Sequence, residues 1–213
     1  MDAILSALGI ESPSMPAPRA EIRPTEDAPI VAARETPRVE VVHWGLFGEE
    51  RDGKKRAPLI NVRAESLVTR PQFAKLFTLH RCVALSDGFY EWLPGETPRA
   101  RKVPYLIHAP DGGPVALAGI YAAAKDGSAR SFALLTTEAN DVVAKIHDRM
   151  PVIVPRARLR DWLAPHAVTV DDLADVLRPA PHDALVAEPY AAPVTGERKS
   201  AEAIAQLALF RDD

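Results

Sequence analysis

The chain has 213 residues, of which 47% are hydrophobic, and its 26 Lys+Arg against 29 Asp+Glu give a formal net charge of -3. A chain of this length buries roughly 70% of the surface that its unfolded form exposes, which suffices for one domain with a hydrophobic core. The charge balance excludes a molecule whose overall field attracts nucleic acid or anionic membranes, and the single cysteine, Cys82, excludes internal disulfides.

The N-terminal part predicts a short helix over residues 2–8, followed by an extended segment. The start lacks the basic flank and apolar stretch of a secretion signal, and no apolar run approaches the ~20 residues of a membrane span, so we expect a cytoplasmic protein. Between residues 12 and 37 there are six prolines, which predict irregular chain lying across the surface of the domain.

Most of the remaining elements are predicted to be strands, because hydrophobic and polar residues alternate and turn signals such as Asp111-Gly112 separate the segments. The predicted strands are residues 39–44, 59–63, 81–86, 89–93, 103–108, 115–121, 131–136, 150–154 and 184–187. Residues 48–58 are charged and predict an exposed loop.

Four helices are predicted between and after these strands, and each carries an apolar stripe. They begin at Pro71, after Thr137 (residues 138–146), at Pro155 and after Thr169. We expect an α+β fold with a bent, mainly antiparallel sheet or barrel-like core and flanking helices. Residues 1–190 would form the domain and residues 191–213 a C-terminal tail.

Two ionisable residues stand at the edges of apolar segments. Glu91 lies between Tyr90 and Trp92, where burial would raise the pKa of its carboxyl group and suit it to acid–base chemistry. An exposed glutamate on the rim of a sheet would show the same pattern. His147 follows a predicted helix, where an imidazole can act in catalysis or simply cap carbonyl groups.

Asn61 and Arg63 share the polar face of an otherwise apolar strand, so they could bind a substrate and a phosphate, although ordinary polarity of an edge strand explains them equally well. Cys82 lies in an apolar run that favours a buried structural thiol. No HExxH, CxxC or GxSxG arrangement is present in the sequence, and we expect neither a metal nor a cofactor.

Seven short motifs resemble, in order and spacing, the SRAP domain, the SOS-response-associated peptidase family of abasic-site sensors. The resemblance covers roughly residues 20–190. The motifs are Trp44-Gly45-Leu46, Ile60-Asn61-Val62-Arg63-Ala64-Glu65, Arg81-Cys82, Asp87-Gly88-Phe89-Tyr90-Glu91-Trp92, Leu117-Ala118-Gly119-Ile120, Leu135-Thr136-Thr137-Glu138-Ala139-Asn140 and Ile146-His147-Asp148-Arg149-Met150-Pro151.

The resemblance implies a monomer that binds abasic sites in single-stranded DNA. Members of the family remove their own initiator methionine, and the exposed cysteine forms a thiazolidine with the ring-opened sugar. Carried over, Glu91 would be the acid–base residue, His147 would assist ring opening and reversal, and Asn61 would orient the terminal amine.

The resemblance also implies the DNA contacts. Arg63 and Arg149 would hold phosphates beside the lesion, and Trp44 with its loop would lie near the kinked strand. On a chain with a slightly acidic balance, these arginines would supply a local positive groove for single-stranded DNA.

The chain departs from the family at its start. The family begins Met-Cys-Gly-Arg, whereas this chain begins Met1-Asp2-Ala3. Asp2 cannot replace the cysteine, because a thiazolidine needs an α-amine and a thiol on the same residue. Two interpretations follow: the natural start lies upstream and supplies the cysteine, or the chain is a paralogue that binds single-stranded or damaged DNA without crosslinking. We favour the first, because Asn61, Glu91 and His147 are all in place.

Two other hypotheses stay open. The chain could be a pure interaction module in which Glu91 and His147 are structural, and in that case Glu91→Gln would change neither affinity nor chemistry. It could also be a lyase that acts on the abasic sugar through the Met1 amine, which borohydride trapping of the imine would reveal.

Overall fold

The structure is a computed structural model that describes residues 2–11, 16, 17, 19–46, 57–95, 97, 101–124, 127–190 and 206–208. The strands are β1 (Asp27–Ala32), β2 (Val39–Trp44), β3 (Asn61–Arg63), β4 (Arg81–Ser86), β5 (Gly88–Leu93), β6 (Val103–His108), β7 (Val115–Ala123), β8 (Ala129–Glu138), β9 (Arg149–Pro151), β10 (Val186–Pro189) and β11 (Gln206–Ala208). The α-helices are α1 (Asp2–Ala7), α2 (Ser66–Thr69), α3 (Pro71–Leu79) and α4 (Leu159–Trp162).

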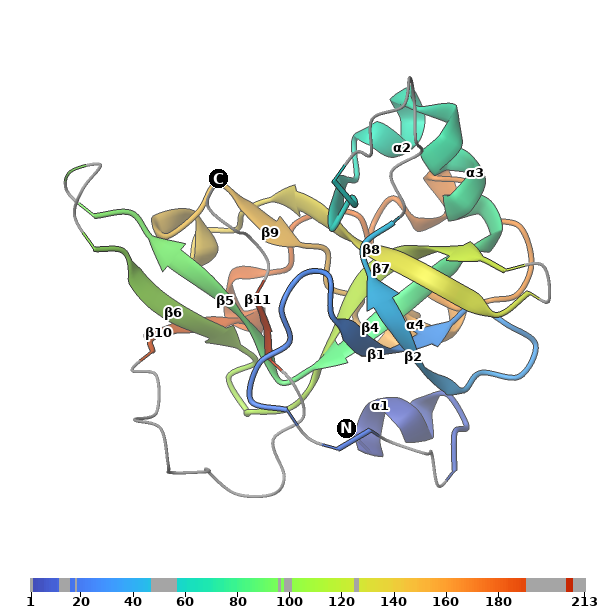
Figure 1. Cartoon of the computed structure of the whole chain (residues 1–213), viewed down its shortest axis with the longest axis horizontal. Coiled ribbons are helices and arrows are strands. Elements are labelled where there is room, and N and C mark those ends of the chain that lie inside the picture. Colours follow the sequence, from blue (N-terminus) through green and yellow to red (C-terminus); the bar gives the residue numbers. More distant parts are fainter. Residues whose placement is uncertain are drawn as a thin grey trace.

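Five strands close into a barrel in the order β2-β1-β4-β7-β8, with β2 pairing back onto β8 (Figure 1). The neighbouring pairs within this ring are antiparallel, except the closing pair β2–β8, which is parallel. The expectation of a mainly antiparallel, barrel-like core is therefore confirmed. The helices are short, so the protein is mainly β.

Strand β1 corrects the prediction that residues 12–37 lack regular structure. It pairs with β2 from Asp27 to Val31 but with β4 only from Ile30 onward. Pro29 therefore lies where β4 does not yet pair with β1, and a proline, which has no N–H, is tolerated at such a position. The number of prolines alone could not reveal this, because β4, whose pairing with β1 begins only after Pro29, is distant in sequence.

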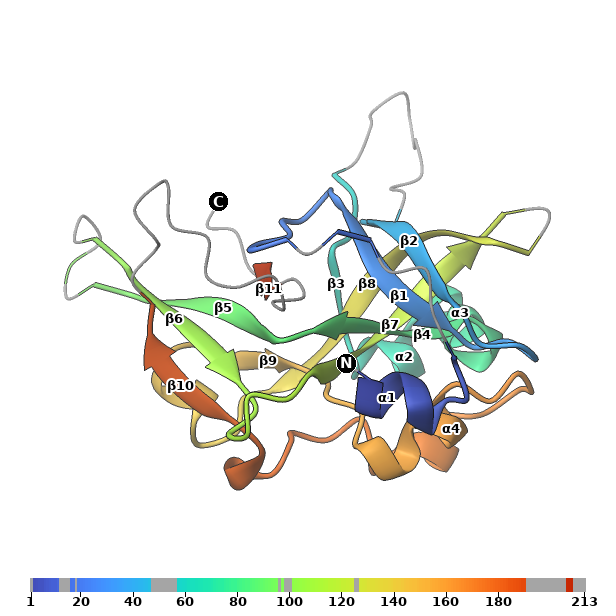
Figure 2. The ribbon, with the colours of Figure 1, turned by 90° about the horizontal axis from the view of Figure 1, so that it is seen from below.

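A second, smaller sheet has the order β10-β6-β5-β11 and lies beside the barrel, at the left of Figure 1 and Figure 2. Strands β5 and β6, both predicted as strands, pair antiparallel. On the other edge of β5, β11 pairs in parallel, with Leu207 opposite Phe89.

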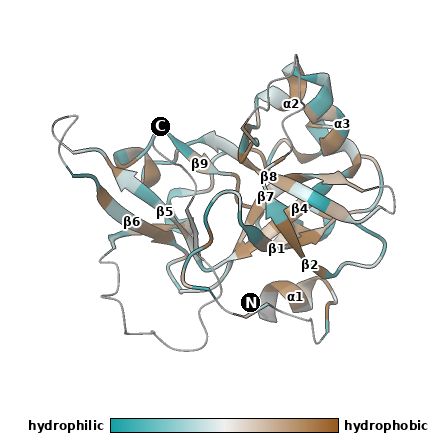
Figure 3. Cartoon of the chain, viewed as in Figure 1, coloured by the Kyte–Doolittle hydropathy of each residue, from teal (hydrophilic) through white to brown (hydrophobic). Residues whose placement is uncertain are grey.

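The barrel strands carry a hydrophobic core on each face, because alternate residues point in opposite directions. Val31 belongs to a cluster that includes Leu5 of α1 and Phe77 of α3. Ile30 belongs to a second cluster that includes Phe89 of the small sheet. The barrel thus packs helices against one face and the small sheet against the other, and hydrophobic colouring runs along its strands and α1 (Figure 3).

The region before His147 is not the predicted helix of residues 138–146. Strand β8 continues to Glu138, and only a 3-10 turn, η1 (Val143–Lys145), follows. Thr137 pairs with Met150 in the sheet, and the Oδ1 atom of Asn140 accepts from the backbone N–H of Val143 at 3.0 Å. The asparagine side chain caps a tight turn here, which is an alternative to a full helix.

Three further 3-10 turns complete the structure: η2 (Arg156–Arg158), η3 (Asp171–Leu173) and η4 (His182–Ala184). The predicted helix after Pro155 is present as η2 and α4, whereas the one after Thr169 is reduced to η3 and the turns behind it. Within the described ranges, no helix is both long and apolar enough to span a membrane.

Candidate functional site

The C-terminal end of β8 places residues from two strands side by side. Strand β3 pairs with β8 in parallel on one edge, so that Arg63 lies opposite Thr136. Strand β9 pairs antiparallel with the same end of β8, with Pro151 opposite Thr136 and Arg149 opposite Glu138. Arg63 and Arg149, the two arginines predicted to contact phosphates, therefore flank the same end of β8.

Arg149 is held by its side chain as well as by its strand. Its Nη1 and Nη2 atoms donate to the two carboxylate oxygens of Glu65 at 2.8 and 2.9 Å, and Nη2 also donates to the Thr136 carbonyl at 2.7 Å. The Arg149 side chain is only 14% exposed, whereas that of Glu65 is 55% exposed. The Arg149 guanidinium holds the pKa of the Glu65 carboxyl below its usual value, with a smaller contribution from Arg63.

His147 lies two residues before the start of β9 at Arg149 and is oriented by this strand. The backbone N–H of Arg149 donates to the Nδ1 atom of His147 at 2.9 Å. A neutral imidazole that accepts through Nδ1 carries its proton on Nε2. An Asp148 carboxylate oxygen lies 3.2 Å from the same Nδ1 and can pair with the ring once it is protonated. The side chain is 30% exposed, so the ring is within reach of a bound molecule.

Glu91 is almost fully buried, at 1% exposure, which confirms the predicted withdrawal from solvent and shows that the exposed-rim alternative is wrong. Its neighbour across the strand pair is Tyr105 of β6. By the alternation of a strand, Glu91 shares its face of β5 with Phe89, which belongs to the cluster between the small sheet and the barrel. The carboxyl group thus faces the junction of the two sheets.

Asn61 and Arg63 stand on β3 as the alternation predicts, Asn61 half-buried and Arg63 exposed. Ile60, directly before Asn61, and Val143, Ile146 and Met150 around His147 all pack on the same cluster as Phe89. Asn61, Glu91 and His147 therefore border one cluster from three separate elements. That their side chains converge on one groove stays a prediction.

Trp44 requires a correction. Its side chain is 0% exposed, its Nε1–H donates to the Ile60 carbonyl at 2.8 Å, and its ring stacks on Phe132 at 6.3 Å between centroids. A ring buried in this way cannot itself contact DNA. It anchors the strand end from which the loop departs, and the predicted loop of residues 48–58 lies outside the described residues except for its last two.

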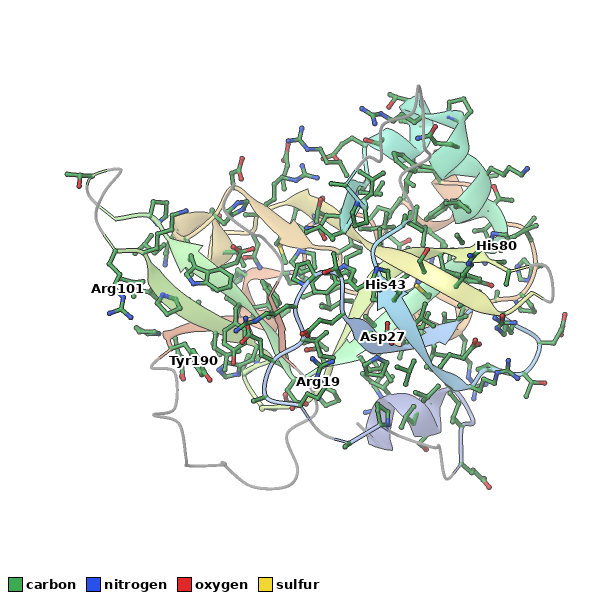
Figure 4. All side chains as sticks on the ribbon, viewed as in Figure 1. Arg19, Asp27, His43, His80, Arg101 and Tyr190 are labelled. Atoms are coloured by element: carbon green, nitrogen blue, oxygen red, sulfur yellow. The ribbon has the colours of Figure 1, made fainter. Side chains whose placement is uncertain are left out.

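Cys82 is buried at 0% exposure, which confirms the prediction of a structural thiol, and burial raises the pKa of this thiol far above its usual value. The remaining histidines are scattered, as Figure 4 illustrates for His43 and His80. His43 faces Asp27 across β1 and β2, with 3.6 Å between Nδ1 and Oδ1. No cluster of three or more His, Cys, Asp or Glu able to hold a metal ion occurs in the part of the chain that the structure describes.

Sequence reasoning did not assign a role to Glu65 or Thr136, although both lie within the motifs. The signal that could have drawn attention to Glu65 is its place two residues after Arg63. Its partner Arg149 is 84 positions away, so the pair could not be found by spacing.

Three curated relatives are named abasic site processing proteins. YoaM of Bacillus subtilis is 34% identical over 161 residues, which cover 72% of this chain and 67% of YoaM. YoqW of Bacillus subtilis is 33% identical over 148 residues, covering 67% of this chain and 64% of YoqW. YedK of Escherichia coli is 29% identical over 127 residues, covering 59% of this chain and 54% of YedK. The chain thus spans at most about two thirds of the length of these relatives.

Solved structures share the fold. A protein from Bacteroides thetaiotaomicron matches with a TM-score of 0.66 and 28% identity, over 79% of this chain and 75% of that one. A phage-related protein from Bordetella bronchiseptica matches with a TM-score of 0.71 and 24% identity, over 96% of this chain and 95% of that one, and it supports the fold alone. The sequence family described as SOS response associated peptidase (SRAP) matches residues 2–196. This chain therefore belongs to the SOS response associated peptidase family.

Proposed function

We propose that this protein recognises abasic sites in single-stranded DNA and processes them at the junction of the barrel and the small sheet. The observation that carries the proposal is the group at the end of β8, where an exposed Arg63, the Glu65–Arg149 pair and the oriented imidazole of His147 adjoin one another. The names of the relatives support abasic sites as the substrate class.

The proposed division of roles follows from burial and charge. Arg63 is exposed and contacts a phosphate of the strand, as a cation at a DNA-binding surface does. Glu91 is withdrawn from water and moves protons at the opened sugar. His147 assists opening of the sugar ring through Nε2, the nitrogen that carries the proton when Nδ1 accepts from Arg149.

Asn61 has a role only in a protein that carries an N-terminal cysteine. There its carboxamide would orient the terminal amine while the thiol and amine add to the sugar aldehyde. Thiazolidine formation joins both groups to the aldehyde carbon and releases one water, so it needs proton transfer but no oxidant. A buried carboxyl group and an imidazole are suited to that task.

The test compares two fluorescent single-stranded oligonucleotides that differ only in one abasic site. We expect tighter binding to the abasic strand by about tenfold, equivalent to about 1.4 kcal/mol. Arg63→Gln should weaken binding to both strands and reduce the slope of log K against log[salt] by about 0.7, the value for one phosphate on a single strand. Arg178→Gln, at an exposed position, is the control.

Two results would count against the proposal. Equal affinity for the abasic and intact strands would leave the non-crosslinking binding alternative in its place. Binding that does not respond to Arg63→Gln would show that the strand runs elsewhere on the molecule. His147→Ala should reduce discrimination between the two strands while leaving affinity for the intact strand close to that of the wild type.

A further inference from the structure

The ion pair between Glu65 and Arg149 joins the two sides of the candidate site. Glu65 follows β3, which carries Asn61 and Arg63, whereas Arg149 opens β9 and orients His147. Both carboxylate oxygens are used, each by a different Nη atom of the guanidinium. Such a bidentate contact restricts rotation of the arginine side chain much more than a single hydrogen bond does.

The remaining donors of Arg149 define what the guanidinium can still bind. Of its five N–H groups, Glu65 and the Thr136 carbonyl use three. The Nε atom is buried and has no hydrogen-bond partner among the described residues. The second N–H of Nη1 is left for a further acceptor. An arginine fixed in this way can meet an anion without losing much additional conformational freedom.

We propose that Glu65 is a positioning residue that holds the Arg149 guanidinium in the orientation in which it contacts a phosphate of the bound DNA strand. This inference rests on the proposed function and goes beyond it, because it assigns to an acidic residue beside the DNA a favourable effect on binding. Glu65 touches Arg149 and not the DNA, so it acts through the arginine.

Charge counting makes the opposite prediction. Glu65 is a negative charge beside a polyanion, and removing it should strengthen DNA binding if only Coulomb interactions matter. If Glu65 instead positions Arg149, removing it should weaken binding, because the arginine then loses its preferred orientation. The sign of the change in affinity therefore separates the two explanations.

The experiment measures the dissociation constant for abasic single-stranded DNA as a function of salt concentration. We expect Glu65→Gln to weaken binding by roughly five- to tenfold and to lower the salt slope by about 0.7, as if one phosphate contact were lost although the arginine remains. Glu65→Asp keeps the charge but shortens the side chain, and we expect it to weaken binding in the same direction. In the Arg149→Gln background, Glu65→Gln should have no further effect.

The matched control is another bidentate pair, Arg158–Asp175, in which Nε and Nη2 each lie 3.0 Å from a carboxylate oxygen. Asp175→Asn removes a bidentate ion pair of an arginine that the sequence did not assign to the site, while Arg158 keeps its contact with Asp161, and it should change neither affinity nor salt slope. Thermal unfolding of each variant separates weakened binding from a loss of folded protein.

The outcomes distinguish the two levels of the proposal. If Glu65→Gln binds as tightly as the wild type, or more tightly, while Arg149→Gln binds less tightly, the positioning role is wrong and the DNA-binding function stands. If the wild type does not bind single-stranded DNA, or if Arg63→Gln and Arg149→Gln both bind normally, the proposed function itself is wrong, and the role of Glu65 is wrong with it.

Discussion

The side chain of Arg81 should be one of the largest single contributors to the stability of the fold. It is 0% exposed and contacts no carboxylate among the described residues; instead, its five N–H groups donate to five backbone carbonyls. The acceptors are the carbonyls of Phe77, Thr78, Trp162, Ala164 and His166. Burial lowers the pKa of Arg81 to about 10, so the group stays charged at neutral pH.

The position of this charge explains why it is tolerated. Helix α3 ends at Leu79 and α4 ends at Trp162, so Arg81 lies at the C-terminal ends of two helices, where unpaired carbonyls favour a cation. In Arg81→Met, these carbonyls lose their donors. The two bonds to Phe77 and Trp162 are fully buried, and each orphaned carbonyl costs about 1–3 kcal/mol, so we expect a loss of about 4 kcal/mol.

Urea unfolding followed by tryptophan fluorescence measures this loss, because Trp162 is one of the residues that Arg81 holds. A loss of about 4 kcal/mol should also lower Tm by roughly 8–16 °C in a domain of this size. Arg81→Lys keeps the charge but has only three donors, so its effect should be intermediate. The exposed Arg178→Met should stay within about 0.5 kcal/mol of the wild type. If Arg81→Met unfolds within about 1 kcal/mol of the wild type, the carbonyls find other donors and the reasoning is wrong.

Three further predictions concern other parts of the chain. The carboxylate of Asp172 accepts from the N–H and the hydroxyl of Thr169, and these hydrogen bonds lower the pKa of Asp172 below its usual value, so the charged carboxylate stabilises the fold at neutral pH. The Tm difference between the wild type and Asp172→Asn should therefore be present at pH 7 and disappear as the pH falls through the lowered pKa. A difference that stays constant with pH would contradict this prediction. Gly88→Ala would place Cβ 2.5 Å from the Ile107 carbonyl oxygen and should cost about 1–3 kcal/mol in urea unfolding, so an unchanged midpoint would contradict the packing. A polypeptide that begins Met1-Asp2-Ala3 should form no boiling-resistant adduct with abasic DNA, because its single thiol, that of Cys82, is buried and is not at the N-terminus. An adduct band on a denaturing gel would overturn this prediction.

Most strands of the small sheet and of the second half of the barrel could be predicted because their local signals agree with their environment, but β11, which lies in the predicted C-terminal tail, could not. Residues 81–86 and 103–108 were placed with the bounds that the structure has, and Phe73 and Phe77 are buried as the helical spacing indicates. In these segments the alternation of apolar residues and the flanking turn residues are sufficient to predict the element, because neither signal depends on distant residues.

Elements whose form depends on distant partners could not be predicted. Pro29 is compatible with a barrel strand only because β4 begins to pair one residue later. Residues 138–146 have the apolar spacing of a helix, but Glu138 is still paired in the sheet and Asn140 closes a tight turn. Trp44 was placed near DNA by resemblance, yet the barrel closes around it. In each case tertiary packing outweighs the local pattern.

The candidate site shows the same limit for individual side chains. Residue types and order single out Asn61, Glu91 and His147 as candidates whose roles stay predictions, and they do not say what holds these side chains. From the sequence alone, an arginine is expected to be a mobile cation. In the structure, Arg149 has a carboxylate and a carbonyl as fixed partners. Under the proposed positioning role, loss of the neighbouring acid weakens the phosphate contact of a fixed arginine, whereas simple Coulomb interaction predicts that it strengthens the contact of a mobile one. Glu65, to which the sequence assigned no role, is for this reason the residue whose substitution most directly tests the proposed binding of DNA.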